Sequence, residues 1–180
     1  CLMSHNIGDL AATCRVVFYE HHLSHAASTY LASPFDKSLI ISWDGRGEWP
    51  CILAALGRGD QIEVIHREYF PNSIGQAYQA ISQYLGFSDM GDEYKVMGLS
   101  AYGEPKFKET FKKFIKVKKG RVTINQSYMN YYIYNREMAD RFSLNMTSEL
   151  GVARREQEPI DQRHMDIARS LQDRVNEVGV

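Results

Sequence analysis

This sequence of 180 residues has little cysteine, and its cysteines form no recognisable pattern. Cys1, Cys14 and Cys51 are odd in number, widely separated and in no CxxC arrangement. They therefore argue against a disulfide framework and against a thiolate zinc site. We expect small, buried thiols in a protein that occupies a reducing compartment.

The sequence also lacks an excess of either charge. Lys and Arg number 21, Asp and Glu number 22, and the formal net charge is -1. No overall field draws such a chain to nucleic acid or to an anionic membrane, so neither is an expected partner. Any partner has to be recognised by local features of the surface.

Long apolar runs are missing as well. No stretch of eighteen apolar residues is present, and the opening CLMSHNIGDL lacks the basic start and the continuous apolar core of a signal peptide. These absences predict a cytoplasmic protein. The sequence does not begin with Met, and its last residues, LQDRVNEVGV, still follow a helical pattern. We therefore expect a piece of a longer chain.

What is present indicates a globular α/β domain, with 44% hydrophobic and 12% aromatic residues. A short apolar run, residues 16–19, predicts a buried strand, and a helix of about three turns from His21 to Leu31 follows it. Ser33-Pro34 ends that helix. Three strands of a β-meander come next, separated by the turn sequences DGRGE and GRGD: Ser38 to Trp43, Cys51 to Leu56 and Ile62 to Tyr69.

Helical spacing returns in the second half of the chain. Ser73 and Gln76 form a capping box for a helix that Gly86 ends, and a shorter helix is predicted over residues 92–99. Pro105 is predicted to open another helix, and RVTIN and YYIYN to form a pair of peripheral strands. The helix after Pro105 would bury Phe107, Phe111, Phe114 and Ile115. A final helix aligns Ile167, Leu171, Val175 and Val178.

Three of the six histidines lie within five residues, in the stretch EHHLSHAAS. Residues four apart on a helix share one face, with Cβ atoms about 5 to 6 Å apart, so two imidazoles can bind one ion at about 2.0 to 2.1 Å. His21 and His25 have this spacing, and His22 and His25, three apart, can also converge. The alternative is that these histidines hydrogen-bond to the backbone or lie on the surface.

Asp44 is the nearest further ligand, because it follows the apolar strand LIISW and points into whatever cleft caps that end of the sheet. Asp-Gly between two strands is also typical of a tight hairpin. Both interpretations can hold, because Gly45 and Gly47 let a phosphate approach the backbone N-H groups closely.

Two further features indicate an anion site. The helix that begins after Ser73 has free N-H groups at its first turn, where Gly75 removes a side chain. Lys95 lies among apolar residues in EYKVMGL, where a lysine either faces a ligand or forms an ion pair. The acidic residues within reach are Asp92, Glu93 and Glu104.

Four motifs occur in a fixed order: EHHLSHAASTYLASPF, DGRGEW, FPNSIGQAYQAISQYLGF and DEYKVMGLSAYGEP. They resemble the amino-terminal part of the carbamoyltransferase family that includes nodulation and antibiotic O-carbamoyltransferases. The later EPIDQRHMDIARSLQDRV is also similar to that family. The resemblance covers most of the chain, from about Tyr19 to Val178.

This resemblance implies part of a Kae1-like domain with the ribonuclease H-like, actin-like ATPase fold, in which a β-meander carries flanking helices. It also implies a metal, usually iron with zinc as the alternative, held by the two histidines of HxxxH and by aspartates. By position these ligands are His21, His25 and Asp44, rather than His22. A further aspartate ligand, a glycine-rich nucleotide loop and a YrdC-like domain lie downstream in the family, so residues 1–180 resemble a fragment.

The resemblance further implies an O-carbamoyltransferase. In that family ATP and carbamoyl phosphate give a carbamoyl-adenylate in the YrdC-like domain, and the Kae1-like domain transfers the carbamoyl group to a hydroxyl of a small molecule. The chain would hold part of the transfer site, would need the remaining domains of the same polypeptide, and would be inactive alone. The residues expected near the nucleotide or carbamoyl-adenylate are Gly45, Gly47, Ser73, Gly75 and Lys95.

Two alternatives remain. The sibling tRNA threonylcarbamoyl transferases share HxxxH and the fold, but the sequences HHLSHAAS and EYKVMGLSAYGEP resemble those of the small-molecule branch of the family. The isoelectric point near 6.7 also lacks the basic character expected for tRNA binding. From a different class, the chain could be a non-catalytic module in which the metal is only structural.

Overall fold

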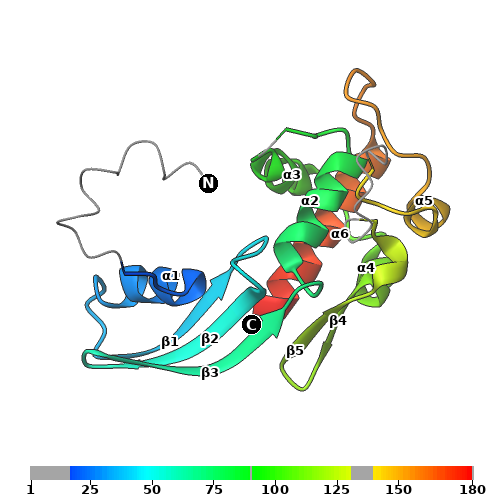
Figure 1. The fold of residues 1–180 in the computed structure, drawn as a ribbon. Helices are drawn as coiled ribbons and strands as arrows, with labels where there is room; N and C mark the ends of the chain where they lie inside the picture. The colour runs from blue at the N-terminus through cyan, green and yellow to red at the C-terminus, as the bar shows by residue number, and fades with distance from the viewer. Residues whose placement is uncertain (1–16, 90, 131–139, 180) are drawn as a thin grey trace, which may run out of the picture.

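The computed structural model describes residues 17–89, 91–130 and 140–179. A three-stranded sheet with one helix on its face lies beside a group of helices and a small hairpin (Figure 1). The α/β class is therefore confirmed. Among the described helices, none combines the length and the apolar character needed to cross a membrane.

The predicted β-meander is confirmed, and each strand is slightly longer than expected. Strands β1 (Lys37–Trp43), β2 (Pro50–Arg58) and β3 (Gln61–Tyr69) pair antiparallel in the order β1-β2-β3. The turn from β2 to β3 contains Gly59, whose φ of 58° is a left-handed value that glycine adopts without strain. DGRGE forms the loop between β1 and β2.

Helix α1 (His21–Tyr30) lies on one face of this sheet, as Figure 1 shows. Ala26 and Tyr30 of the helix pack on sheet residues to form a small core. Gly57 of β2 allows this packing, because a Cβ atom there would come within 2.4 Å of the Tyr30 ring. The sheet residues of this core are Ile40, Leu53 and Ala55.

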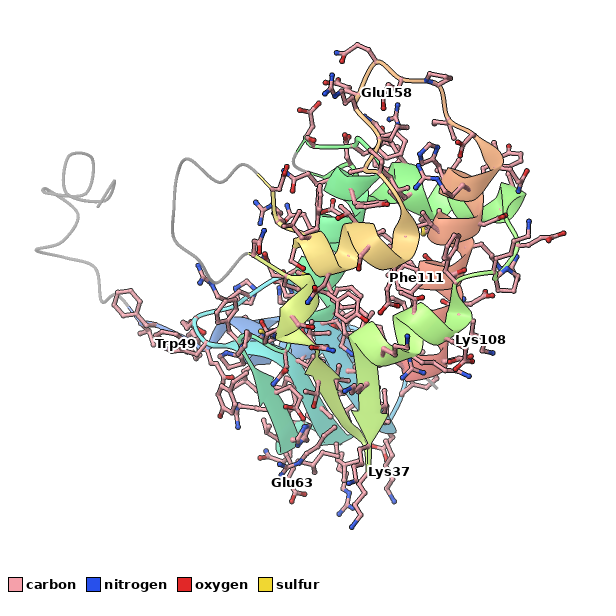
Figure 2. The ribbon with its side chains drawn as sticks, turned by 90° about the vertical axis from the view of Figure 1, so that its right-hand side faces the viewer. Lys37, Trp49, Glu63, Lys108, Phe111 and Glu158 are labelled. Atoms are coloured by element: carbon pink, nitrogen blue, oxygen red, sulfur yellow. The ribbon has the colours of Figure 1, made fainter. Side chains whose placement is uncertain are left out.

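The second part of the structure contains most of the buried side chains. In Figure 1 helices α2 and α6 run side by side through its centre, and Figure 2 shows Phe111 inside it, on α4. The predicted stop at Gly86 is confirmed by its φ of 78°. The elements are α2 (Ile74–Tyr84), α3 (Glu93–Leu99), η1 (Ser100–Tyr102), α4 (Lys108–Phe114), β4 (Ile115–Lys118), β5 (Arg121–Ile124), η2 (Gln126–Tyr128), α5 (Leu144–Leu150) and α6 (Gln162–Gly179).

Several predicted elements need correction. The described part of the first apolar run, residues 17–19, forms no strand; Phe18 is 85% exposed, so the run does not belong to a buried sheet. Helix α4 begins at Lys108, three residues after Pro105, and the N-H of Phe107 just before it donates to the Ser170 hydroxyl of α6 at 3.0 Å. Ile115 is in strand β4 and not in this helix, since it pairs with Ile124.

RVTIN forms a strand as predicted, β5, and its described partner is β4. Strand β5 pairs with β4, whose sequence IKVK alternates apolar and charged residues in the way a strand at the surface requires. The other predicted strand, YYIYN, lies outside the described residues, as do Cys1 and Cys14. Cys51 is a buried free thiol, as expected. Helix α5 was not predicted.

Two leucines test which face of the sheet is packed. Leu53 is fully buried beneath α1, whereas Leu39 lies on β1 with 59% of its surface exposed. We expect Leu53→Ala to lower the free energy of unfolding by about 2 to 5 kcal/mol. Leu39→Ala, a matched control, should cost less than about 1 kcal/mol. Denaturant unfolding measures both, and equal losses would contradict the packing of α1 on this face.

Candidate metal centre

The side chains of His21, His25 and Asp44 meet at one end of the sheet. His21 Nε2 lies 2.6 Å from Asp44 Oδ2 and 3.0 Å from His25 Nε2. His25 Nε2 lies 3.6 Å from the same carboxylate oxygen. Two histidines from the first turns of α1 and one carboxylate from the end of β1 therefore present three ligand atoms to a common point.

The start of α1 is fixed in place by Glu20 and Arg67. Glu20 has an extended backbone, and its carbonyl accepts the Ser24 N-H at 2.9 Å, so the helix begins at His21. Its carboxylate accepts two hydrogen bonds from Arg67 of β3, at 2.7 and 3.0 Å. The hydrogen bond from Arg67 holds the pKa of Glu20 below its usual value. This pair anchors the end of α1 that carries His21.

The three ligand atoms fit a small divalent cation. They lie within 4.8 Å of one another, and atoms with these separations can all be about 2.1 Å from a single point. Two imidazoles and a carboxylate suit iron, zinc and similar ions. Each of the three side chains is more than one third exposed, so such an ion would keep coordination positions open to solvent.

His22 makes contacts that leave neither ring nitrogen for a metal. It is fully buried, with Nδ1 2.8 Å from the Ser42 hydroxyl oxygen and Nε2 3.0 Å from the Pro50 carbonyl oxygen. Spacing alone left His22 and His21 as alternative first ligands. The buried contacts of His22 favour His21 and give His22 a structural role between α1 and the sheet.

Asp44 is held as an ionised carboxylate. Burial by itself would raise its pKa, but the hydrogen bond with His21 and the one from the Gly45 backbone N-H outweigh it, so the pKa is lowered. The Gly45 N-H is 2.6 Å from Oδ1, the oxygen that does not face His21. A carboxylate held in this way keeps one oxygen, Oδ2, directed at the two histidines.

The structure brings four of the five residues predicted to lie near the nucleotide close to Asp44 or its histidines. A Cβ atom on Gly47 would lie 3.1 to 3.2 Å from the His21 and His22 side chains. Gly45 follows Asp44, and Ser73 and Gly75 contact the backbone of residues 44 and 45. Lys95 instead forms an ion pair with Asp92 at 2.6 Å, the alternative already considered for it.

A groove of about 1230 Å³ opens beside Asp44, between the end of the sheet and helices α2 and α3. A smaller pocket of about 380 Å³ is also lined by Asp44 and includes His25. The groove is lined by aromatic, amide and charged side chains. They include Trp43, Arg46, Tyr78, Glu93, Tyr94 and Arg141.

Sequence reasoning missed the two arginines of this groove. Arg46 lies over the Phe70 ring, 5.6 Å from its centre, and Arg141 donates to Gln76 at 3.3 Å. Arg46 lies in the turn sequence DGRGE, and the turn pattern by itself does not distinguish it as a groove residue. Arg141 comes from a segment 65 residues away from Gln76, and no local pattern indicates that contact.

The family described as "Carbamoyltransferase N-terminus" matches residues 7–180. The chain belongs to this family. The resemblance stated from the four motifs is thereby confirmed.

Individual relatives agree with this assignment. The chain is 39% identical to the uncharacterized protein sll1178 of Synechocystis sp. over an alignment of 164 residues that covers 87% of the chain and 25% of the relative. It is 33% identical to the nodulation protein NolNO of Sinorhizobium fredii over 98% of the chain and 24% of the relative. The nodulation protein NolO of Bradyrhizobium diazoefficiens is 33% identical over 88% of the chain and 26% of the relative. The chain thus spans about a quarter of the length of these relatives.

Substitution of His22 is expected to lower stability, whereas substitution of His25 is expected to lower metal affinity. His22→Ala removes a buried ring and leaves Ser42 and Pro50 without their partner, so it should lower the free energy of unfolding by about 2 kcal/mol or more. His25→Ala, at an exposed position, should leave the stability of the metal-free protein nearly unchanged and lower zinc affinity. Denaturant unfolding and calorimetric metal titration measure the two effects. Equal metal affinity in His25→Ala and wild type would exclude His25 as a ligand.

Proposed function

We propose that this chain forms the metal-binding part of the transfer site of an O-carbamoyltransferase, which moves a carbamoyl group to a hydroxyl of a small molecule. The observation that carries the proposal is the meeting of His21, His25 and Asp44 in a chain of the carbamoyltransferase family. Within this proposal ATP and carbamoyl phosphate supply a carbamoyl-adenylate, and the fold is part of a ribonuclease H-like, actin-like ATPase domain.

His21, His25 and Asp44 would hold the cation, with iron as the first candidate and zinc as the second. When bound there, a divalent cation supplies positive charge for the phosphate of an adenylate as AMP leaves. The backbone next to Asp44 sets the direction of its carboxylate. Asp44 keeps one oxygen on the histidines because its other oxygen is bonded to the Gly45 N-H.

The groove beside Asp44 is the proposed position of the acceptor or of the adenylate. Its aromatic rings offer flat apolar contacts, while Arg46 and Arg141 offer donors to phosphate or hydroxyl oxygens. Formation of the adenylate, and the remaining ligand and nucleotide loop, are assigned to other parts of the full-length polypeptide. This division agrees with the fact that the chain spans about a quarter of its relatives.

The test uses the full-length protein and separates the two half-reactions. Pyrophosphate release from ATP with carbamoyl phosphate reports formation of the adenylate, and carbamoylated product reports transfer. We expect Asp44→Asn and His25→Ala to lower transfer by more than about 100-fold, because loss of a mere outer-shell partner already costs about 10 to 100-fold. Pyrophosphate release should change little.

His66→Ala is the matched control, since His66 lies on β3 and pairs with Glu68 at 2.8 Å, away from the proposed ligands. It should leave both half-reactions intact. Unchanged transfer in Asp44→Asn and His25→Ala would overturn the proposal. Modification of tRNA instead of a small hydroxyl compound would support the threonylcarbamoyl alternative, and joint loss of metal and folding would favour a purely structural metal.

A further inference from the structure

The first turn of α2 packs directly on the peptide that joins Asp44 to Gly45. Ser73, the residue that caps α2, is fully buried, and its hydroxyl accepts the Gln76 N-H at 3.0 Å. The same hydroxyl lies 2.6 Å from the Gly45 carbonyl oxygen and 3.2 Å from that of Asp44. A hydroxyl has one proton to donate, and the shorter distance assigns it to Gly45.

Gly75 is the second contact between α2 and this peptide. A Cβ atom at position 75 would lie 2.9 Å from the Gly45 nitrogen and 3.0 Å from the Asp44 carbonyl carbon and oxygen. These neighbours are backbone atoms, which cannot swing aside as the end of a flexible side chain can. Gly75 has no positive φ, so its lack of a side chain serves close approach and not an unusual conformation.

The orientation of this peptide decides where the Asp44 carboxylate points. The Gly45 N-H donates to Oδ1 at 2.6 Å, and Oδ2 then lies 2.6 Å from His21. A rotation of the peptide moves this N-H and with it the carboxylate. Gly75 packs on the Asp44-Gly45 peptide itself, and Ser73 binds the Gly45 carbonyl of the next peptide while its oxygen lies 3.2 Å from the Asp44 carbonyl oxygen. Both residues therefore act on Asp44 through the backbone of residues 44 and 45.

We propose that Ser73 and Gly75 are positioning residues for the metal ligand Asp44, and that they act by clamping the backbone of Asp44 and Gly45 at the end of β1 against the first turn of α2. The proposal rests on the proposed metal centre. It replaces the expectation that Ser73 contacts a nucleotide, because the buried Ser73 hydroxyl uses its proton on the protein backbone. Gly75 also lines the groove, but the atoms nearest to its missing side chain belong to Asp44 and Gly45.

The experiment measures metal affinity and ligand geometry in the full-length protein without any assay of activity. Zinc titration calorimetry gives the dissociation constant, and the visible spectrum of the cobalt-loaded protein reports the arrangement of the ligands. We expect Ser73→Ala and Gly75→Ala each to raise the dissociation constant by at least about tenfold, the usual effect of losing an outer-shell partner, and to change the cobalt spectrum. Ser73→Thr keeps the hydroxyl and should retain affinity within about threefold of wild type.

Two matched controls separate positioning from general loss of stability. Ser82→Ala removes another buried hydroxyl of α2, one that donates to the Tyr78 carbonyl at 3.1 Å. Gly98→Ala adds a methyl group to α3, where nothing lies within 4 Å of it. Both controls should keep the wild-type affinity and spectrum, and thermal unfolding of the metal-free variants shows how far each one is destabilised.

The outcomes distinguish this proposal from the proposed function. If the wild-type protein binds neither zinc nor cobalt, the metal centre itself is wrong. If wild type binds metal, and Ser73→Ala and Gly75→Ala bind it with the same affinity and spectrum, the clamp is wrong and the metal centre stands. If the variants lose affinity only as much as Ser82→Ala and Gly98→Ala do, the effect is general destabilisation and the clamp is also wrong.

Discussion

The seating of α1 on the sheet is the constraint on which the site depends. His22 hydrogen-bonds to Ser42 of β1 and to the Pro50 carbonyl at the start of β2, and Glu20 is paired with Arg67 of β3. These contacts fix both the height and the rotation of the first turn of α1. Because His21 and His25 are on the same helix, their imidazoles are then carried to the end of β1, where Asp44 lies. The buried His22 thus positions two histidines that are only partly buried or exposed, His21 and His25.

Asp44 is held from the opposite side by the second part of the structure. Helix α2 has its last turns in the main core, where Ile81 and Tyr84 are fully buried, and its first turn against Asp44 and Gly45. Because the same helix contacts both, packing of α2 in the main core helps to fix the position of the Asp44 carboxylate. Asp44 lines both the groove, together with Ile74 of the main core, and the smaller pocket, together with Ala26 and Ile40 of the small core.

The cluster of His21, His25 and Asp44 is interpreted as a metal centre in the light of the family to which the chain belongs. The family and its nodulation relatives NolNO and NolO match most of the chain. Two imidazoles and a carboxylate form a cluster that is partly exposed to solvent, and its carboxylate, Asp44, also lines the groove. Such a cluster can bind a cation and still admit a phosphate group, and a closed structural metal site would not. Since the chain spans about a quarter of those relatives, the exposed part of the cluster also leaves room for ligands from elsewhere in a full-length polypeptide.

Much of the local structure could be predicted from the sequence. The β-meander, the capped helix after Ser73 and the placing of His25 within reach of either His21 or His22 follow from short-range patterns, because alternation, capping and the helical repeat act within a few residues. Patterns of this kind failed where a distant partner decided the outcome. Ile115 belongs to a strand because Ile124 lies opposite it, and Val17 to Tyr19 are apolar but have no place in the sheet.

By itself, the sequence determined the family, the α/β class and the set of candidate metal-binding side chains, since all three depend on the residue types and their order along the chain. Only the tertiary structure decided that both nitrogens of His22 are used in the interior, that Lys95 pairs with Asp92, and that Ser73 and Gly75 contact the peptide of Asp44. The physical reason is that a hydrogen bond or a steric contact depends on which atoms meet in space. Ser73 and Asp44 are 29 residues apart in the chain, and only the packing of α2 beside β1 brings them together.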